Sequence, residues 1–354
     1  MTKINFVINN LKVGGAEKVV TDLCNEFDIN YDVEIITLHK NKLNLNLPSH
    51  IVLTHLENYN YISKIIHIYK KNKQKNSITI SFLPLSNILC IISNFFSKGK
   101  LIISVRNDLK LKPTSKKIFF LSRILYRFSN LTICQTEKIY QTLKNDYNVN
   151  KCKIIPNYVN QHSLIDNCES TKKYFDDEKV NFISVGTKFF QKGFDEIIKT
   201  FQKIDSSFKN YRLIIVGVDL NDLKNNNFRI DNLDNIFFTG LIGNVNDFYS
   251  KSNYYILGSR YEGFSNTMIE AINFGVFPIL KEDVSGVTEI KKNLPETICF
   301  KNFNELQSII EEILLNNKKQ TFSKNDLIKF KNKYSKLNIL KLWDDQIQNL
   351  LNET

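Results

Sequence analysis

The chain lacks the residue arrangements that mark disulfide-rich proteins, zinc proteins and several classes of hydrolase. Its six cysteines are scattered from Cys24 to Cys299 without a C-x-x-C pair, which argues against a disulfide framework or a zinc site and favours a reducing compartment. The five histidines show no metal-ligand spacing, and no Ser-His-Asp or Cys-His arrangement is evident. The chain also contains no Asp-x-Asp pair, an arrangement of carboxylates that would hold a divalent cation.

Long apolar segments are also absent. The longest apolar runs, such as residues 88–92, fall far short of the roughly 20 residues that span a bilayer. Residues 1–8 show neither the apolar region nor the cleavage site of a signal peptide. We therefore expect a cytoplasmic protein whose contact with the inner face of the plasma membrane is peripheral.

The formal charge of +12 is distributed unevenly along the chain. Residues 1–170 contain 23 Lys and Arg against 12 Asp and Glu, whereas residues 171–354 contain 25 against 24. This asymmetry indicates that the first half meets an anionic surface. The sequence contains no RNP, zinc-finger or helix-turn-helix signature, so an anionic membrane leaflet is favoured over nucleic acid. A Lys-rich surface that only confers solubility is the alternative.

The length of 354 residues is sufficient for two domains with sizeable cores. Short apolar segments alternate with segments of helical periodicity, which predicts an α/β protein with parallel, Rossmann-like sheets. The polar segment 161–177 is the expected linker. The expected strands are residues 4–8, 33–38, 51–54, 77–82, 101–105 and 131–134 in the first half, and 180–185, 212–218, 235–239, 255–257 and 277–280 in the second.

Residues 254–280 carry the clearest functional pattern. A strand at 255–257 is followed by a loop with Glu262 and Gly263, and then by a helix that begins near residues 265–267 and carries Glu270. A helix N-terminus with unpaired N–H groups attracts phosphate, and Gly263 allows close approach of backbone to a ligand. Glu270, about one turn inside the helix, could reach a vicinal diol. Alternatively, Thr267 and Glu270 form a capping box and Glu262 is a solvated loop acid.

This stretch resembles the E-x7-E motif of retaining glycosyltransferases of family 4. Glu262-Gly-Phe, Glu270-Ala, Gly275 and Pro278 match its usual pattern. The resemblance implies that Glu270 holds the ribose hydroxyls of a nucleotide. It also implies that Glu262 and the backbone N–H groups of residues 263–266 (Gly263, Phe264, Ser265 and Asn266) contact the donor sugar and diphosphate.

The resemblance extends over nearly the whole chain and implies the GT-B fold, with two Rossmann-like domains facing across a cleft. We expect an acceptor-binding domain at residues 1–165 and a nucleotide-sugar-binding domain at 175–333. The last segment, 334–354, is expected to form a helix that crosses back to the N-terminal domain.

Two further stretches are similar to family motifs. Gly14-Gly15-Ala-Glu matches a loop that closes over the donor diphosphate, and Lys192-Gly193 matches a Lys-Gly pair whose Lys holds that diphosphate. The family has an Arg before this pair, and Thr187 stands at its position. The adjacent Lys188 could replace that Arg, but its side chain would point in a different direction, because neighbouring residues of a strand point to opposite faces.

Arg106 and Asn107 stand where many family 4 enzymes have a His. We expect one of them to steady the acceptor or the leaving diphosphate. The alternative is a solvated Arg at a strand end.

Residues 114–129 interleave four basic residues with aromatic and aliphatic ones. Such a helix suits the headgroup boundary of a membrane, and a core helix with a solvated basic edge is the alternative.

The resemblance implies transfer of a hexose or N-acetylhexosamine from a nucleoside-diphosphate sugar, expected to be UDP-linked. The expected acceptor is a lipid-linked or growing bacterial surface glycan, such as O-antigen, capsule or lipopolysaccharide. We expect no cofactor, metal or nucleic acid, because lysines and a helix terminus can offset the diphosphate charge. A sugar-nucleotide epimerase of the same fold and a non-catalytic nucleotide-sugar-binding scaffold are the alternatives.

Overall fold

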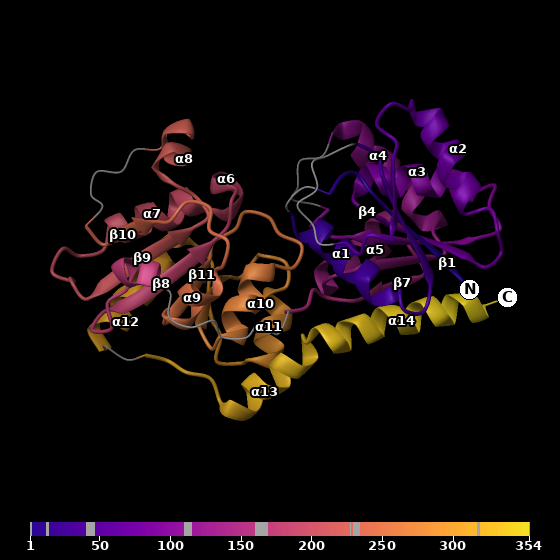
Figure 1. Cartoon of the computed structure of the whole chain (residues 1–354). Helices are drawn as coiled ribbons and strands as arrows, with labels where there is room; N and C mark the ends of the chain where they lie inside the picture. The colour runs from indigo at the N-terminus through magenta and orange to yellow at the C-terminus, as the bar shows by residue number, and fades with distance from the viewer. Residues whose placement is uncertain are drawn as a thin grey trace. The chain divides into compact units, whose positions relative to one another are not determined.

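The computed structural model describes residues 2–11, 14–39, 47–109, 115–159, 169–226, 228, 234–316 and 319–353. The chain divides into two compact units, and each is built on a parallel β-sheet with helices packed against it (Figure 1). Unit 1 comprises Met1–Asn157 and Leu337–Thr354, and unit 2 comprises Tyr158–Lys336. All strand pairs in the described ranges are parallel, which confirms the predicted α/β class with two Rossmann-like sheets.

Unit 1 contains a seven-stranded sheet in its described part, with strand order β3-β2-β1-β4-β5-β6-β7. The order reverses between β1 and the central strand β4. Its elements are β1 (Lys3–Ile8), α1 (Gly15–Phe27), β2 (Asp32–Thr37), β3 (Val52–His55), α2 (Tyr61–Lys71), β4 (Ser77–Phe82), α3 (Pro84–Asn94), β5 (Lys100–Val105), α4 (Lys116–Leu125), the 3-10 helix η1 (Tyr126–Phe128), β6 (Leu131–Cys134), α5 (Glu137–Tyr147), β7 (Cys152–Ile154) and the C-terminal helix α14 (Lys336–Asn352).

Unit 2 contains a six-stranded sheet in its described part, with strand order β10-β9-β8-β11-β12-β13. Here the order reverses between β8 and β11. Its elements are η2 (Glu169–Tyr174), β8 (Val180–Val185), α6 (Phe189–Lys192), α7 (Phe194–Gln202), β9 (Tyr211–Val216), α8 (Leu220–Asn225), β10 (Ile236–Phe238), α9 (Asn246–Ser250), β11 (Tyr254–Leu257), α10 (Asn266–Asn273), β12 (Phe277–Lys281), α11 (Val287–Asn293), β13 (Ile298–Phe300), α12 (Phe303–Asn316) and α13 (Lys324–Lys333).

The central strands are buried along their whole length because both faces of each sheet are covered, although β4 and β8 contain Ser, Thr and Asn as well as apolar residues. All six residues of β4 and of β8 are buried, as expected for strands inside a parallel sheet. The helices contribute one apolar face each. In α7, for example, Ile197, Ile198 and Phe201 are buried against the sheet of unit 2.

Several sequence predictions differ from the structure. The helices α6, α8 and α11 and the strand β13 were not predicted, because elements of three to seven residues give little periodicity. Helix α3 begins at Pro84, since proline suits the first helical turn. The linker prediction is wrong at its C-terminal end, where Phe175 packs into the core of unit 2, and residues 160–168 lie outside the described residues.

The last helix, α14, packs on unit 1, as the fold prediction required. Trp343 is fully buried, and its ring stacks on that of Phe82 with centroids 6.0 Å apart. The Tyr31 hydroxyl donates to Asp344 Oδ1 at 2.5 Å, and burial together with this carboxylate raises the pKa of Tyr31 to about 12. Unit 1 is therefore completed by residues from the far end of the chain.

No helix in the described ranges is long and apolar enough to cross a bilayer.

The substitution Trp343→Ala should destabilise unit 1 by about 3–5 kcal/mol, because it leaves a large cavity beside Phe82. Hydrogen exchange should become faster in β1 and β4 and stay unchanged in β8 and β11. Leu337→Ala on the same helix is the control, since Leu337 is 80% exposed and should have no effect. Equal effects of the two substitutions would contradict the proposed anchoring by Trp343.

Candidate functional site

The candidate site lies at the carboxyl edge of the sheet of unit 2, where the strand order reverses. The chain leaves β8 and the adjacent strand β11 at this edge and enters α6 and α10, respectively. Ligands of open parallel sheets bind outside the carboxyl ends of the strands at such a switch point. The residues that follow β8 and β11 are therefore the first candidates.

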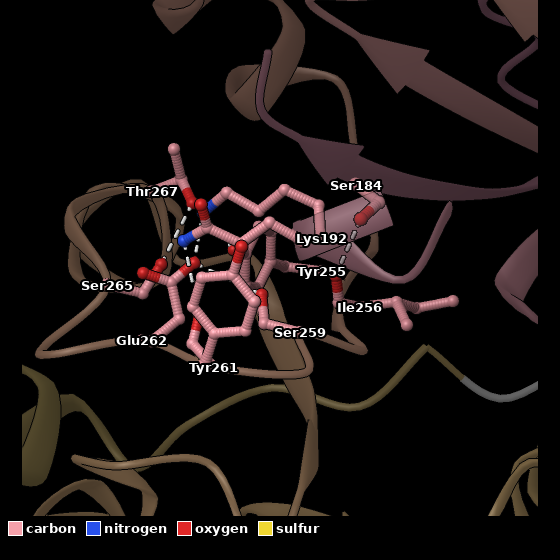
Figure 2. A network of polar contacts seen from close by, with 10 residues as sticks. Ser184, Lys192, Tyr255, Ile256, Ser259, Tyr261, Glu262, Ser265 and Thr267 are labelled. Atoms are coloured by element: carbon pink, nitrogen blue, oxygen red, sulfur yellow. Dashed lines mark hydrogen bonds and ion pairs between the residues drawn. The ribbon is translucent and has the colours of Figure 1, made fainter. Parts of the chain in front are cut away.

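Glu262 follows β11 and is held in place by two donors. Its Oε1 accepts from Lys192 Nζ at 2.5 Å and from Ser259 Oγ at 3.1 Å. The Glu262 and Lys192 side chains are only 12% and 15% exposed. Figure 2 shows this network from close by. The interpretation of Glu262 as a solvated loop acid is therefore wrong.

Lys192 is placed by α6, a single helical turn that follows β8. Gly186 makes room for its aliphatic stem, since a Cβ at residue 186 would lie 2.6 Å from Lys192 Cε. Burial lowers the pKa of Lys192, but the nearby charge of Glu262, with that of Glu270, outweighs this and leaves the pKa raised above its ordinary value. Lys192 is therefore a fixed, protonated cation at neutral pH.

The N-terminus of α10 lies in the same network. Ser265 precedes the helix and makes no side-chain capping hydrogen bond. The Thr267 hydroxyl is instead 2.7 Å from the Tyr255 hydroxyl and 3.1 Å from Ser265 Oγ (Figure 2). The predicted capping box of Thr267 and Glu270 is therefore wrong. The first-turn amides of α10 have no intrahelical acceptor, which leaves them available to an anion.

Asn266, the first residue of α10, adds a polar group at this position. Its side-chain oxygen is buried and has no hydrogen-bond partner among the described residues. A buried amide oxygen without a partner is uncommon in folded proteins and marks a place where a ligand can complete the bonding.

Glu270 projects from α10 one turn after its start. Its Oε2 accepts from the Tyr249 hydroxyl at 3.4 Å. Burial and the charge of Glu270 raise the pKa of Tyr249 well above its ordinary value, so this hydroxyl remains a donor. Since Glu270 also acts electrostatically on Lys192, the structure brings Glu262, Glu270 and Lys192 into one site.

Gly263 and Phe264 shape the loop between the two acids. Phe264 is 4% exposed and stacks on Tyr334 with ring centroids 5.5 Å apart. Gly286 has φ of +94°, and a Cβ there would lie 2.5 Å from the Phe264 ring. The Phe264 side chain thus anchors the loop in the core, which leaves its backbone as the part that can meet a ligand.

Lys188 and Thr187 precede α6 and are exposed. Thr187 occupies the place of the family Arg, so this position offers no cation. Lys188 forms no ion pair with the described part of the chain and is the second cation near the edge of the sheet.

An ion pair that sequence reasoning missed joins the loop after β11 to the first turn of α7. Arg260 Nη1 and Nη2 each donate to Asp195 at 2.7 Å, and Nη1 also donates to the Phe190 carbonyl at 2.7 Å. The guanidinium lies 3.9 Å from the centre of the Phe190 ring. The backbone N–H of Arg260 donates to the Gln191 carbonyl at 2.9 Å. These contacts fix α6, and hence Lys192, to the loop that carries Glu262.

The remaining candidates belong to unit 1. Gly14 and Gly15 form the junction at the start of α1, which follows the central strand β1. Arg106 and Asn107 follow β5. Arg106 is buried, donates to Asn157 Oδ1, and has its guanidinium 5.8 Å from the centre of the Phe82 ring. The interpretation of Arg106 as a solvated strand-end residue is therefore wrong.

Residues 167–327 match the family model described as glycosyl transferases group 1. This segment contains all the candidates of unit 2. The charge of the site is carried by Lys192 and the acids, and no group of three or more His, Cys, Asp or Glu in the described ranges is arranged to hold a metal ion.

Known proteins resemble the chain over most of its length. It is 27% identical over 310 residues to the GalNAc-alpha-(1->4)-GalNAc-alpha-(1->3)-diNAcBac-PP-undecaprenol alpha-1,4-N-acetyl-D-galactosaminyltransferase of Campylobacter jejuni, covering 83% of each chain. Sucrose-phosphate synthase from Thermosynechococcus elongatus superposes with a TM-score of 0.79 at 14% identity, covering 100% of both chains. Anabaena HepE in complex with UDP superposes with a TM-score of 0.78 at 14% identity, covering 98% of this chain and 100% of HepE. The chain is a glycosyltransferase, and its two parallel-sheet units have the GT-B fold.

Arg260→Ala should loosen α6, because it removes a forked ion pair and a bond to the Phe190 carbonyl. Bonds to charged groups contribute about 1.5–3 kcal/mol each, so amide exchange at Lys192 and Gly193 should be accelerated by roughly tenfold or more. Arg260→Lys should recover part of the protection, since lysine keeps the charge but not the fork.

The matched control is Lys199→Ala on the neighbouring helix α7. Lys199 forms an exposed ion pair with Glu196 at 3.8 Å, and such pairs contribute little. Unchanged exchange at Lys192 in Arg260→Ala, or the same change in Lys199→Ala, would contradict the role given to Arg260.

Proposed function

We propose that the enzyme transfers a sugar, with retention of anomeric configuration, from a UDP-sugar to a lipid-linked glycan of the bacterial surface. The observation that carries this proposal is the Lys192–Glu262 pair beside the uncapped N-terminus of α10, with Glu270 one turn further along. Together these groups provide a cation, free amides and two carboxylates on one edge of a sheet. A nucleoside-diphosphate sugar presents an anion, a ribose diol and sugar hydroxyls, and it therefore matches each group.

The diphosphate is assigned to Lys192 and the first turn of α10. Lys192 is protonated and immobile before the donor arrives, and the amide dipoles of the helix start add positive potential. Lys188 is exposed beside α6 and supplies a second cation. These groups can neutralise the leaving diphosphate without a metal ion. Gly14 and Gly15 of unit 1 are proposed to close over the same diphosphate.

The ribose is assigned to Glu270. Its carboxylate accepts from the Tyr249 hydroxyl, and a carboxylate can accept several hydrogen bonds at once, as the two hydroxyls of a diol require. Because the carboxylate lies one turn inside α10, it is set back from the helix start by about the length of that turn. The proposed order along the site is ribose at Glu270 and diphosphate at the helix start.

The donor sugar is assigned to Glu262 and the backbone of residues 263–266. Catalysis then consists mainly of positioning the sugar and stabilising the leaving diphosphate. Arg106 or Asn107 of unit 1 is proposed to steady the acceptor or the leaving group. Arg106 is suited to this because its contacts with Asn157 and Phe82 fix the guanidinium.

The chemistry of donor and acceptor is inferred from the relatives. The Campylobacter jejuni enzyme is named as an N-acetylgalactosaminyltransferase acting on an undecaprenol-linked glycan, and HepE was crystallised with UDP. These names support UDP-N-acetylhexosamine as donor, a hexose being the alternative, and a polyprenyl-linked glycan as acceptor. We propose that the enzyme meets such an acceptor at the cytoplasmic face of the plasma membrane.

Release of UDP tests the function directly. A transferase should release UDP from the donor only when a lipid-linked glycan acceptor is present. An epimerase should convert the sugar of the donor without any acceptor, and a scaffold should bind the donor without converting it. Either of these last two results would overturn the proposal.

Glu270→Ala should abolish detectable binding of UDP, because the ribose hydroxyls lose a charged acceptor. Two charge-assisted hydrogen bonds correspond to a loss of affinity of roughly a hundredfold or more in calorimetric titration. Glu312→Ala, which removes an exposed acid on α12, is the matched control and should bind UDP normally. Normal UDP binding by folded Glu270→Ala would show that the nucleotide binds elsewhere.

Glu262→Gln should lower turnover more than donor affinity. Glutamine keeps an acceptor for Lys192 and Ser259 but removes the negative charge beside the donor sugar. We expect kcat to fall by about 10²–10³, with KM for the donor changing less than about tenfold. Glu262→Ala should have the same kinetic effect and a lower melting temperature, because it leaves Lys192 buried and unpaired. Full turnover in both variants would remove Glu262 from the mechanism.

A further inference from the structure

Helix α4 of unit 1 exposes apolar side chains to solvent. Among its ten residues only Ser122 is buried. Phe119, Phe120 and Ile124 are 40%, 63% and 37% exposed, and Phe128 of η1 is 49% exposed. Ile118 and Leu125 pack against the core of unit 1, as the alternative of a core helix with a solvated basic edge expects, but that alternative does not account for the exposed rings. Residue 114 lies outside the described residues.

The exposed apolar side chains continue onto the end of α3. Phe95 and Phe96 are 53% and 77% exposed, and the Phe95 ring makes an edge-to-face contact with Phe128, with centroids 5.3 Å apart. One contiguous surface thus joins two segments that are about 30 residues apart in the sequence. Several exposed aromatic side chains gathered on one surface are typical of an interaction site. We call it the aromatic-basic surface; its residues are Phe95, Phe96, Lys116, Lys117, Phe119, Phe120, Leu121, Arg123, Ile124, Arg127 and Phe128.

The charged residues of the aromatic-basic surface are all basic, and Asp146 is an acid that lies beside them. Residues 116–128 include four basic side chains and no acidic one. Within the described ranges, no carboxylate forms an ion pair with Lys116, Lys117, Arg123 or Arg127. The Arg and Lys charges are therefore available to an external anion.

The two arginines are held in defined orientations. Arg123 Nε donates to the Asp146 carbonyl at 3.1 Å, and Arg127 Nε donates to the Ile124 carbonyl at 2.9 Å. These bonds to backbone fix the plane of each guanidinium through one nitrogen, which leaves the other two for a ligand. Paired N–H groups of a guanidinium match the oxygens of a phosphate.

We propose that the aromatic-basic surface docks the enzyme onto an anionic phospholipid bilayer. The apolar rings would enter the boundary between headgroups and acyl chains, while the lysines and arginines bind lipid phosphates. A second copy of the chain fits poorly, since two identical surfaces with four cations each would repel one another. The proposal deepens the proposed function, because a lipid-linked acceptor resides in such a bilayer. It is tested without any sugar donor, so its failure is distinct from a failure of transferase activity.

The experiment is flotation of the full chain with vesicles of phosphatidylcholine alone or mixed with phosphatidylglycerol. The wild-type protein should float with the mixed vesicles, less so at high salt, and remain largely unbound with neutral ones. The quadruple variant Lys116→Glu, Lys117→Glu, Arg123→Glu and Arg127→Glu should bind at least about a hundredfold more weakly. A triple variant, Phe96→Ser, Phe120→Ser and Phe128→Ser, should also lose binding although its charge is unchanged.

A charge-matched control separates this surface from the net charge of the protein. Lys291, Lys292, Lys329 and Lys331 of unit 2 are exposed, and their replacement by Glu changes the net charge by the same amount. This control should bind vesicles as the wild type does. Equal losses in both quadruple variants, or undiminished binding by the triple variant, would overturn the proposal. The proposal would also be overturned if the wild-type chain did not bind vesicles and instead dimerised through this surface in sedimentation experiments.

Discussion

The contact between Lys192 and Glu262 is the constraint on which the geometry of unit 2 depends. Its partners are 70 residues apart and follow two adjacent strands, β8 and β11. Lys192 lies on a single helical turn, which has no stability in isolation. That turn is held by Arg260 and by close packing of Gly193, with φ of +69°, against the backbone of Gly258. The contacts of Arg260 and the backbone packing of Gly193 thus determine where Lys192 meets Glu262.

This ion pair also explains how the site can be charged and still be stable. A mostly buried lysine or glutamate alone would carry a large desolvation cost, and each charge here offsets that of the other. In the proposed function a diphosphate approaches a lysine that has already lost most of its water and is fixed in position. The entropic cost of ordering the Lys192 side chain is then met during folding, and donor binding does not have to meet it again. Preorganised charge of this kind is usually the largest contribution to catalysis in enzymes that stabilise a leaving group.

Much of the fold could be predicted from the sequence, whereas the site could be predicted only in part. Buried strands such as β11 and β12 appear as apolar runs, and the motif around Glu262 and Glu270 is local, so both are visible in the sequence. The pair of Arg260 and Asp195 is not visible, because it joins positions 65 residues apart that only the sheet brings together. The alternative of a capping box formed by Thr267 and Glu270 is wrong because of another contact that the local sequence does not show. Thr267 has a tertiary partner, Tyr255, and that contact outweighs the local pattern.

The structure shows how the charges behind the asymmetry of the sequence are arranged in each unit. Unit 2 contains internally paired charges, such as Arg260 with Asp195 and Lys281 with Asp283, so a nearly neutral half can still hold a strongly charged site. In unit 1 the four cations of residues 116–128 have no acidic partner in the described ranges and lie among exposed aromatic rings. Paired charge shapes a site for one small anion, whereas unpaired charge spread over an apolar surface suits an extended anionic one. In the two proposals made above, lysine and arginine thus serve two kinds of recognition: a small anion in unit 2 and an extended anionic surface in unit 1.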